Sequence, residues 1–250
     1  MAHFGLRIVS DVLHAISSRA SATLFLLFLF LVPAHAANVS RDWLGGVPES
    51  GQLAYEVTRK GKPLGFQNID FSRAENGDLI VDVHIEIDFK FGPIKLFTYT
   101  HKNREIWRDG TMMSLKSRTD NNGKDVFVDL RLEGGRYIGT GSRVKDNLEG
   151  PLLSTSYFNP NFIRQTKLVS SQDGRLLPTK IDNLGEETLK IYNKPVRATR
   201  FRLSGKLAID IWYTQTGRWV KTQFERGRNK LVVKETNPAR LPPRKKWRQP

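Results

Sequence analysis

Two histidines are the first candidates for chemistry, because imidazole binds metals and transfers protons near neutral pH. They are His84 and His101, since His3, His14 and His35 lie in an N-terminal stretch that we expect to be removed. The chain has no cysteine, and no further histidine completes a tetrahedral metal site. We therefore interpret both as ordinary strand histidines and expect neither a bound metal nor any other cofactor.

Paired carboxylates are the second candidate. Glu86 and Asp88 lie two positions apart in an alternating stretch, which places them about 7 Å apart on one strand face, within the range of glycosidase acids. Acids with this spacing are common on wet strand faces, and Lys90 beside them indicates a solubilising role. Residues 139–143 lack the closing glycine of a serine-nucleophile elbow, and no phosphate loop or dinucleotide fingerprint occurs. We expect no catalytic residues.

The element that must position these side chains is residues 79–91. Its apolar side chains fall on every second position from Leu79 to Phe91, and polar ones fill most of the gaps. A period of two indicates a β-strand with one buried face. Such a strand would run roughly 40 Å and must twist and coil. We predict an all-β fold, a single curled antiparallel sheet or incomplete β-barrel with little helix and with this strand near its middle.

The same rhythm predicts strands on both sides. Asn76-Gly77 is a strong hairpin signal, and a change of phase near Leu96 and Phe97 predicts a bulge. Residues 147–170 lack the rhythm, so we expect a loop that crosses the sheet, with one helical turn at 162–168. The other expected strands are 51–59, 64–71, 94–107, 112–118, 126–132, 136–141, a strand resuming near 176, 188–192, 196–203, 207–213, 219–224 and 230–234.

The N-terminus predicts export. An apolar run of nine residues, Leu24–Val32, precedes Ala34-His35-Ala36, a small-x-small cleavage pattern. A membrane span needs about 20 apolar residues, so we predict a secretory signal peptide, residues 1–36, cleaved after Ala36, with an uncleaved anchor as the alternative. The absence of cysteine excludes disulfides and a lipid-modified N-terminus. An exported protein without disulfides fits the bacterial periplasm as well as the outside of the cell, and we predict the periplasm.

Behind the signal we expect a short leading segment, residues 37–46, one β domain, residues 47–236, and a basic, proline-rich tail, residues 237–250. The formal net charge of +15 either serves solubility or attracts anionic partners. In the second case, the expected export points to an anionic membrane surface or cell-wall polymer rather than nucleic acid. The tail is extended and is either a solvated end or an electrostatic tether. The tether residues would be Arg240, Arg244, Lys245, Lys246, Trp247 and Arg248.

Three stretches resemble a known family. Residues 55–65 (YEVTRKGKPLG), 209–225 (IDIWYTQTGRWVKTQFE) and 157–160 (YFNP) are similar to the opening hairpin, closing hairpin and central segment of the bacterial domain-of-unknown-function 6134 family and its wider relative, the 3108 family. The resemblance covers about residues 50–235 and implies an exported β-rich domain without an assigned activity. A more distant likeness, in fold alone, is to the half-barrels of periplasmic lipoprotein carriers.

Three functions remain open. The first is a carrier for a lipid or another long apolar molecule on the concave face of the sheet, with an ordinary filled core as the competing interpretation. The second is a structural or adaptor protein of the cell envelope that binds an anionic polymer, a lipid surface or a partner through its basic surface. An enzyme is the third and least favoured, and the oligomeric state is open. The residues expected to line the ligand are Val83, Ile85, Ile87, Phe89, Phe97, Tyr99, Ile209 and Ile211.

Overall fold

The computed structural model describes residues 39–91, 94–204, 208–226 and 229–241. The predicted signal peptide and most of the basic tail lie outside them. Two short 3₁₀ turns, η1 (Pro160–Arg164) and η2 (Pro238–Arg240), are the helical elements of this part of the chain, and neither is long enough to cross a membrane. The strands are β1 (Gln52–Arg59), β2 (Lys62–Arg73), β3 (Leu79–Phe91), β4 (Ile94–Arg108), β5 (Thr111–Asn121), β6 (Lys124–Glu133), β7 (Arg136–Gly141), β8 (Leu148–Glu149), β9 (Leu153–Ser154), β10 (Lys167–Val169), β11 (Leu176–Pro178), β12 (Lys180–Ile191), β13 (Lys194–Ser204), β14 (Ala208–Tyr213), β15 (Trp219–Arg226) and β16 (Asn229–Glu235).

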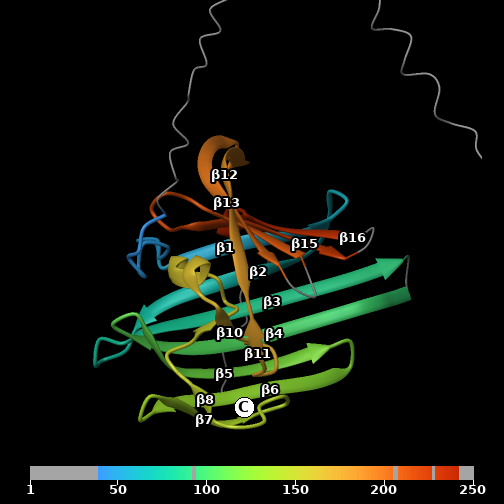
Figure 1. Cartoon of the computed structure of the whole chain (residues 1–250). Coiled ribbons are helices and arrows are strands. Elements are labelled where there is room, and N and C mark those ends of the chain that lie inside the picture. Colours follow the sequence, from blue (N-terminus) through green and yellow to red (C-terminus); the bar gives the residue numbers. More distant parts are fainter. Residues whose placement is uncertain (1–38, 92–93, 205–207, 227–228, 242–250) are drawn as a thin grey trace, which may run out of the picture. The chain divides into compact units, whose positions relative to one another are not determined.

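In the described ranges, 13 strands form one open antiparallel sheet in the order β12-β13-β14-β15-β16-β1-β2-β3-β4-β5-β6-β7-β8. Two meanders make it up, β1 to β8 and β12 to β16, and they join where β1 pairs with β16, as at Val57 and Val233. Figure 1 shows this junction, where the blue β1 lies beside the red β16. The predicted all-β class and curled antiparallel sheet are confirmed, and β3 lies near the middle of the order.

β3 follows its sequence pattern closely. Leu79, Val81 and Val83 are buried on one face, which we call the inner face, while intervening polar residues such as Asp82 are less buried on the opposite, outer face. The predicted bulge is confirmed, because Phe89 pairs with Phe97 and the next pairing skips Leu96. This single extra residue explains the change of phase in the apolar pattern of β4.

Residues 153–178 cross the inner face and form a second sheet, β11-β10-β9. The expected helical turn at 162–168 is wrong in its position, since the 3₁₀ turn spans Pro160–Arg164 and β10 begins at Lys167. Its start is fixed locally. The Asn159 side chain accepts a hydrogen bond from the Asn161 N–H, and Pro160 occupies the first turn, where no N–H is needed.

The strand expected at 188–192 is longer than predicted, since β12 begins at Lys180. β12 lies at the edge of the sheet, and its first half is exposed or half-buried on both faces. A strand of this kind carries no apolar alternation, so periodicity does not detect it.

Aromatic side chains fill the middle of the inner face. Phe158 is buried between Phe71 of β2 and Trp107 of β4, with ring centroids 5.5 and 5.2 Å away. On the other side, Trp219 of β15 contacts Tyr157 at 5.7 Å and stacks on Tyr55 of β1 at 4.1 Å. The crossing segment therefore packs against both meanders, and this part of the inner face is a filled core.

Candidate functional site

A row of polar side chains interrupts the inner face on β4 and β5. His101, Asn103 and Glu105 of β4 are buried there between the aromatic residues Tyr99 and Trp107. Their partners across β5 are Thr119, Ser117 and Leu115, respectively. Buried polar groups are costly unless they are hydrogen-bonded, so each member of this polar row needs a partner or a function.

Glu105 is fully satisfied. Its side chain is 0 % exposed and accepts hydrogen bonds from Asn103 Nδ2 (2.8 Å), Trp107 Nε1 (2.8 Å), Ser154 Oγ (2.5 Å) and Ser156 Oγ (3.2 Å). Burial raises the pKa of this carboxyl, and the four donors act against that rise. The bonds to Ser154 and Ser156 tie β4 to the crossing segment, so the arrangement is structural.

Asn103 and Ser117 behave differently. They are directly opposite each other on β4 and β5, both are buried, and Val83 and Val128 flank them in register. Asn103 Oδ1 and Ser117 Oγ have no hydrogen-bond partner among the described residues. Unsatisfied oxygen atoms on two directly paired residues can accept hydrogen bonds from a water molecule or from the donor group of a ligand.

The two histidines do not form one site. His101 lies on the inner face, with Nδ1 2.7 Å from Thr119 Oγ1, and burial lowers its pKa to about 4, helped by nearby His84. His84 pairs with Lys102 in register, one position away from His101, and so lies on the outer face, where its Nε2 is 3.0 Å from Glu86 Oε1. Among the described residues no group of metal-ligating side chains occurs.

The predicted ligand-lining residues divide into two groups. Val83 and Ile211 are buried in the filled core. The other six are half-buried on the inner face, and two pairs of them are cross-strand partners, Ile87 with Tyr99 and Phe89 with Phe97.

Phe224 of β15 and Leu231 of β16 are also half-buried here and were not predicted. Ile209, Phe224, Leu231 and Arg59 form one row across β14, β15, β16 and β1, and the Arg59 guanidinium lies 5.0 Å from the centre of the Phe89 ring. The contact of Arg59 with Phe89 connects these four residues to β3. We call this set the apolar strip: Ile85, Ile87, Phe89, Phe97, Tyr99, Ile209, Phe224 and Leu231.

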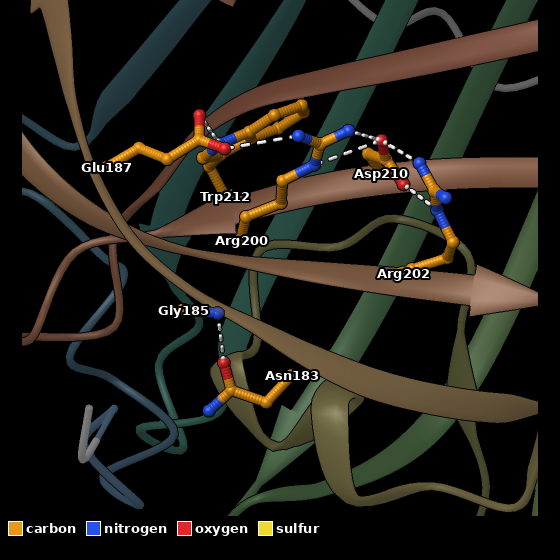
Figure 2. A network of polar contacts seen from close by, with 7 residues as sticks. All are labelled: Asn183, Gly185, Glu187, Arg200, Arg202, Asp210 and Trp212. Carbon is orange, nitrogen blue, oxygen red and sulfur yellow. Dashed lines mark hydrogen bonds and ion pairs between the residues drawn. The ribbon is translucent and has the colours of Figure 1, made fainter. Parts of the chain in front are cut away.

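The outer face of β12 to β14 carries a charged network (Figure 2). Asp210 is buried and accepts hydrogen bonds from Arg200 and, in a bidentate pair of 2.7 and 2.8 Å, from Arg202. Burial opposes ionisation of Asp210, but hydrogen bonds from Arg202 and Arg200 outweigh it and lower the pKa. Arg200 also reaches Glu187, which accepts a bond of 3.0 Å from Trp212 Nε1. The network joins three strands and presents cations outward.

Of the predicted tether residues, Arg240 lies in η2 and is exposed, whereas Arg244, Lys245, Lys246, Trp247 and Arg248 lie outside the described residues. We did not predict four residues of these sites, namely Arg200, Arg202, Asn103 and Ser117. The signal for the polar row was present, because Tyr99 and Trp107 bracket three polar residues on the same alternate positions.

Comparisons with known proteins agree with this geometry. A family model described as "Domain of unknown function (DUF6134)" matches residues 55–234. A crystal structure from Brucella abortus, a beta-barrel-like protein of the domain of unknown function DUF1849, has a TM-score of 0.54 at 12 % sequence identity and covers 74 % of this chain and 95 % of its own. No curated protein matches the chain. At this identity the structural likeness concerns the fold alone.

Proposed function

We propose that this chain, which belongs to the DUF6134 family of domains of unknown function, is an exported β domain that binds a long apolar molecule on the inner face of its sheet. The observation that carries the proposal is the apolar strip. It continues the filled core toward one end of the long strands β3 and β4, where its side chains are only half-buried. Covering such surface contributes about 25 cal/mol per Å².

The polar row gives the proposed site its second part. Tyr99 belongs to the strip and stacks on His101, with ring centroids 6.3 Å apart, and Asn103 follows two residues along β4. An apolar chain on the strip would therefore have one end near the hydrogen-bonding groups of His101 and Asn103. Ligand pockets commonly combine apolar walls with a few polar groups in this way.

The export that we propose is consistent with the same interpretation. The proposed signal peptide, residues 1–36, would deliver the domain to the periplasm, where insoluble molecules need carriers to cross water. The basic residues at the C-terminal end, Arg240 among the described ones, would favour an anionic membrane as the donor or acceptor surface.

The proposal is tested by the uptake of a fluorescent fatty acid and by mass spectrometry of lipids extracted from the purified protein. Ile87→Asp places a charge on the strip and should weaken uptake at least tenfold. Phe127→Asp is the matched control, because Phe127 is exposed on the outer face beside Arg118. If the native protein carries no lipid and takes up no probe, the inner face is an ordinary core.

An adaptor that binds an anionic polymer is the second candidate, and one observation favours it. Burial lowers the pKa of Lys221 on β15, and Lys230, Arg200 and Lys234 act in the same direction against Glu187. Four cations thus lie close together on the outer face of β13, β15 and β16. Co-sedimentation with cell-wall polymer, released by high salt and reduced in Lys221→Gln, is the expected result.

A further inference from the structure

A small cleft opens at the surface of the protein, apart from the apolar strip. Its volume is about 310 Å³, and its walls come from the turn of the β12–β13 hairpin on one side and from β1, β16 and η2 on the other. The lining residues that matter are Glu56, Lys190, Tyr192, Lys234, Glu235 and Arg240.

The hairpin wall is held in place by Tyr192. This residue has φ of 50° in the turn that joins β12 to β13, a conformation that tight hairpin turns require. Its hydroxyl lies 2.9 Å from the carbonyl oxygen of Thr236 and 3.2 Å from Glu235 Oε1, and it donates to these acceptors. Burial, together with the charge of Glu235, raises the pKa of Tyr192 to about 12, so the phenol stays protonated.

Glu235 is the unusual group in the cleft. It is 3 % exposed, and one oxygen, Oε1, contacts the Tyr192 hydroxyl and Arg218 Nη1, the latter at 3.3 Å. The other oxygen, Oε2, is buried and has no partner in the described part of the chain. A buried carboxylate oxygen without a donor is rare, and an N–H donor of a ligand would satisfy it.

Three cations also line the cleft. Lys190, Lys234 and Arg240 reach it from three elements, and none of them forms an ion pair with another described residue. The cleft therefore carries charges of both signs, and Glu56 lies directly opposite Lys234 across β1 and β16. A ligand of a single charge would be attracted by some of these groups and repelled by the others.

We propose that the cleft binds a small zwitterion, with a primary ammonium group at Glu235 Oε2 and a carboxylate or phosphate at Lys190 and Arg240. The size fits, because about 310 Å³ lies at the lower end of ligand pockets and corresponds to about ten water molecules. It suits a free amino acid or the headgroup of an aminophospholipid, but not an acyl chain.

Calorimetric titration with alanine and with O-phosphoethanolamine tests the site, with inorganic phosphate and ethanolamine as the two half-ligands. At least one zwitterion should bind at least tenfold more tightly than either half. Glu235→Gln should remove this advantage while leaving phosphate binding unchanged. Lys190→Gln, a second variant in an exposed position, should weaken the zwitterion, whereas Lys180→Gln at the other end of β12 should not.

Binding to vesicles distinguishes the two possible sources of the zwitterion, a lipid headgroup and a free amino acid. Binding to vesicles that contain phosphatidylethanolamine, in excess of binding to phosphatidylglycerol vesicles, together with O-phosphoethanolamine binding, would identify a lipid headgroup. Binding of alanine without a preference between vesicles would identify a free zwitterion. Two results would overturn the proposal. One is equal affinity for phosphate and for both zwitterions. The other is the absence of heat from every probe at about 10 mM, a concentration at which even weak sites are occupied.

Discussion

Glu105 and Glu235 are two buried glutamates in contrasting surroundings. Both are almost inaccessible, at 0 % and 3 %, and burial raises the pKa of both carboxyls. Glu105 accepts four hydrogen bonds from uncharged donors, while Glu235 uses only one oxygen and leaves the other without a partner among the described residues. The first completes a structure, and the second has capacity for a ligand. Four predictions test this distinction, in order of decreasing effect.

Glu105→Ala should have the largest effect. The change leaves Trp107 Nε1 and Asn103 Nδ2 buried without an acceptor, at about 1–3 kcal/mol each, and opens a cavity. We expect a loss of about 4 kcal/mol in the free energy of unfolding, measured with denaturant. Glu149→Ala, in an exposed position, should change stability by less than about 0.5 kcal/mol. A loss below about 1 kcal/mol for Glu105→Ala would contradict a structural role.

His101 provides the next test. Burial lowers the pKa of this histidine, whereas it raises the pKa of the two glutamates. Its folded pKa of about 4 lies below the ordinary value of 6.5, so the unfolded chain binds more protons between these values. Stability should fall by about 3 kcal/mol as the pH is lowered from 6.5 to 4. His101→Gln has no titrating ring, so subtracting its pH profile isolates this contribution. Parallel profiles of the two proteins would show that the ring is not buried in solution.

Asp210 is a third buried carboxylate, and it differs from both glutamates because its donors are charged. Its pKa is lowered, so it stabilises the fold above its ordinary pKa, and this stability is lost as the pH falls through the folded value. Asp210→Asn should lower the free energy of unfolding by about 2 kcal/mol at pH 7. This loss is smaller than for a fully buried ion pair, because Arg200 and Arg202 are partly exposed. At pH 2 the variant and the native protein should differ much less.

The sequence predicted the sheet better than the sites. Alternation over Leu79–Phe91 defined β3 and its inner face, because a long strand with one wet face has a clear period. It also located the bulge at Leu96, where one residue shifts the phase. The early half of β12 was missed because both of its faces are wet, and a period needs one buried face.

The sites could not be predicted in the same way. Glu105 receives bonds from Ser154 and Ser156, about fifty residues further along the chain, and local pattern carries no information on that pairing. The cleft likewise joins Tyr192 to Glu235, which are 43 residues apart. The sequence pattern does show one anomaly. Glu105 and Glu235 each occupy a position where the alternation of the strand predicts an apolar side chain.

Glu235→Gln should have the smallest effect on stability and the largest on binding. The amide keeps the shape, loses the charge opposite Arg218 and removes the cost of burying a carboxylate, so the two changes offset each other to within about 1 kcal/mol. Because burial raises the pKa of Glu235, the native protein should lose some stability as the pH rises above the ordinary value of 4.5, and the variant should not. Thermal unfolding between pH 4 and pH 8 measures this difference. A large loss at neutral pH would instead mean that Glu235, like Glu105, is fully committed to the fold, and the contrast between the two glutamates would disappear.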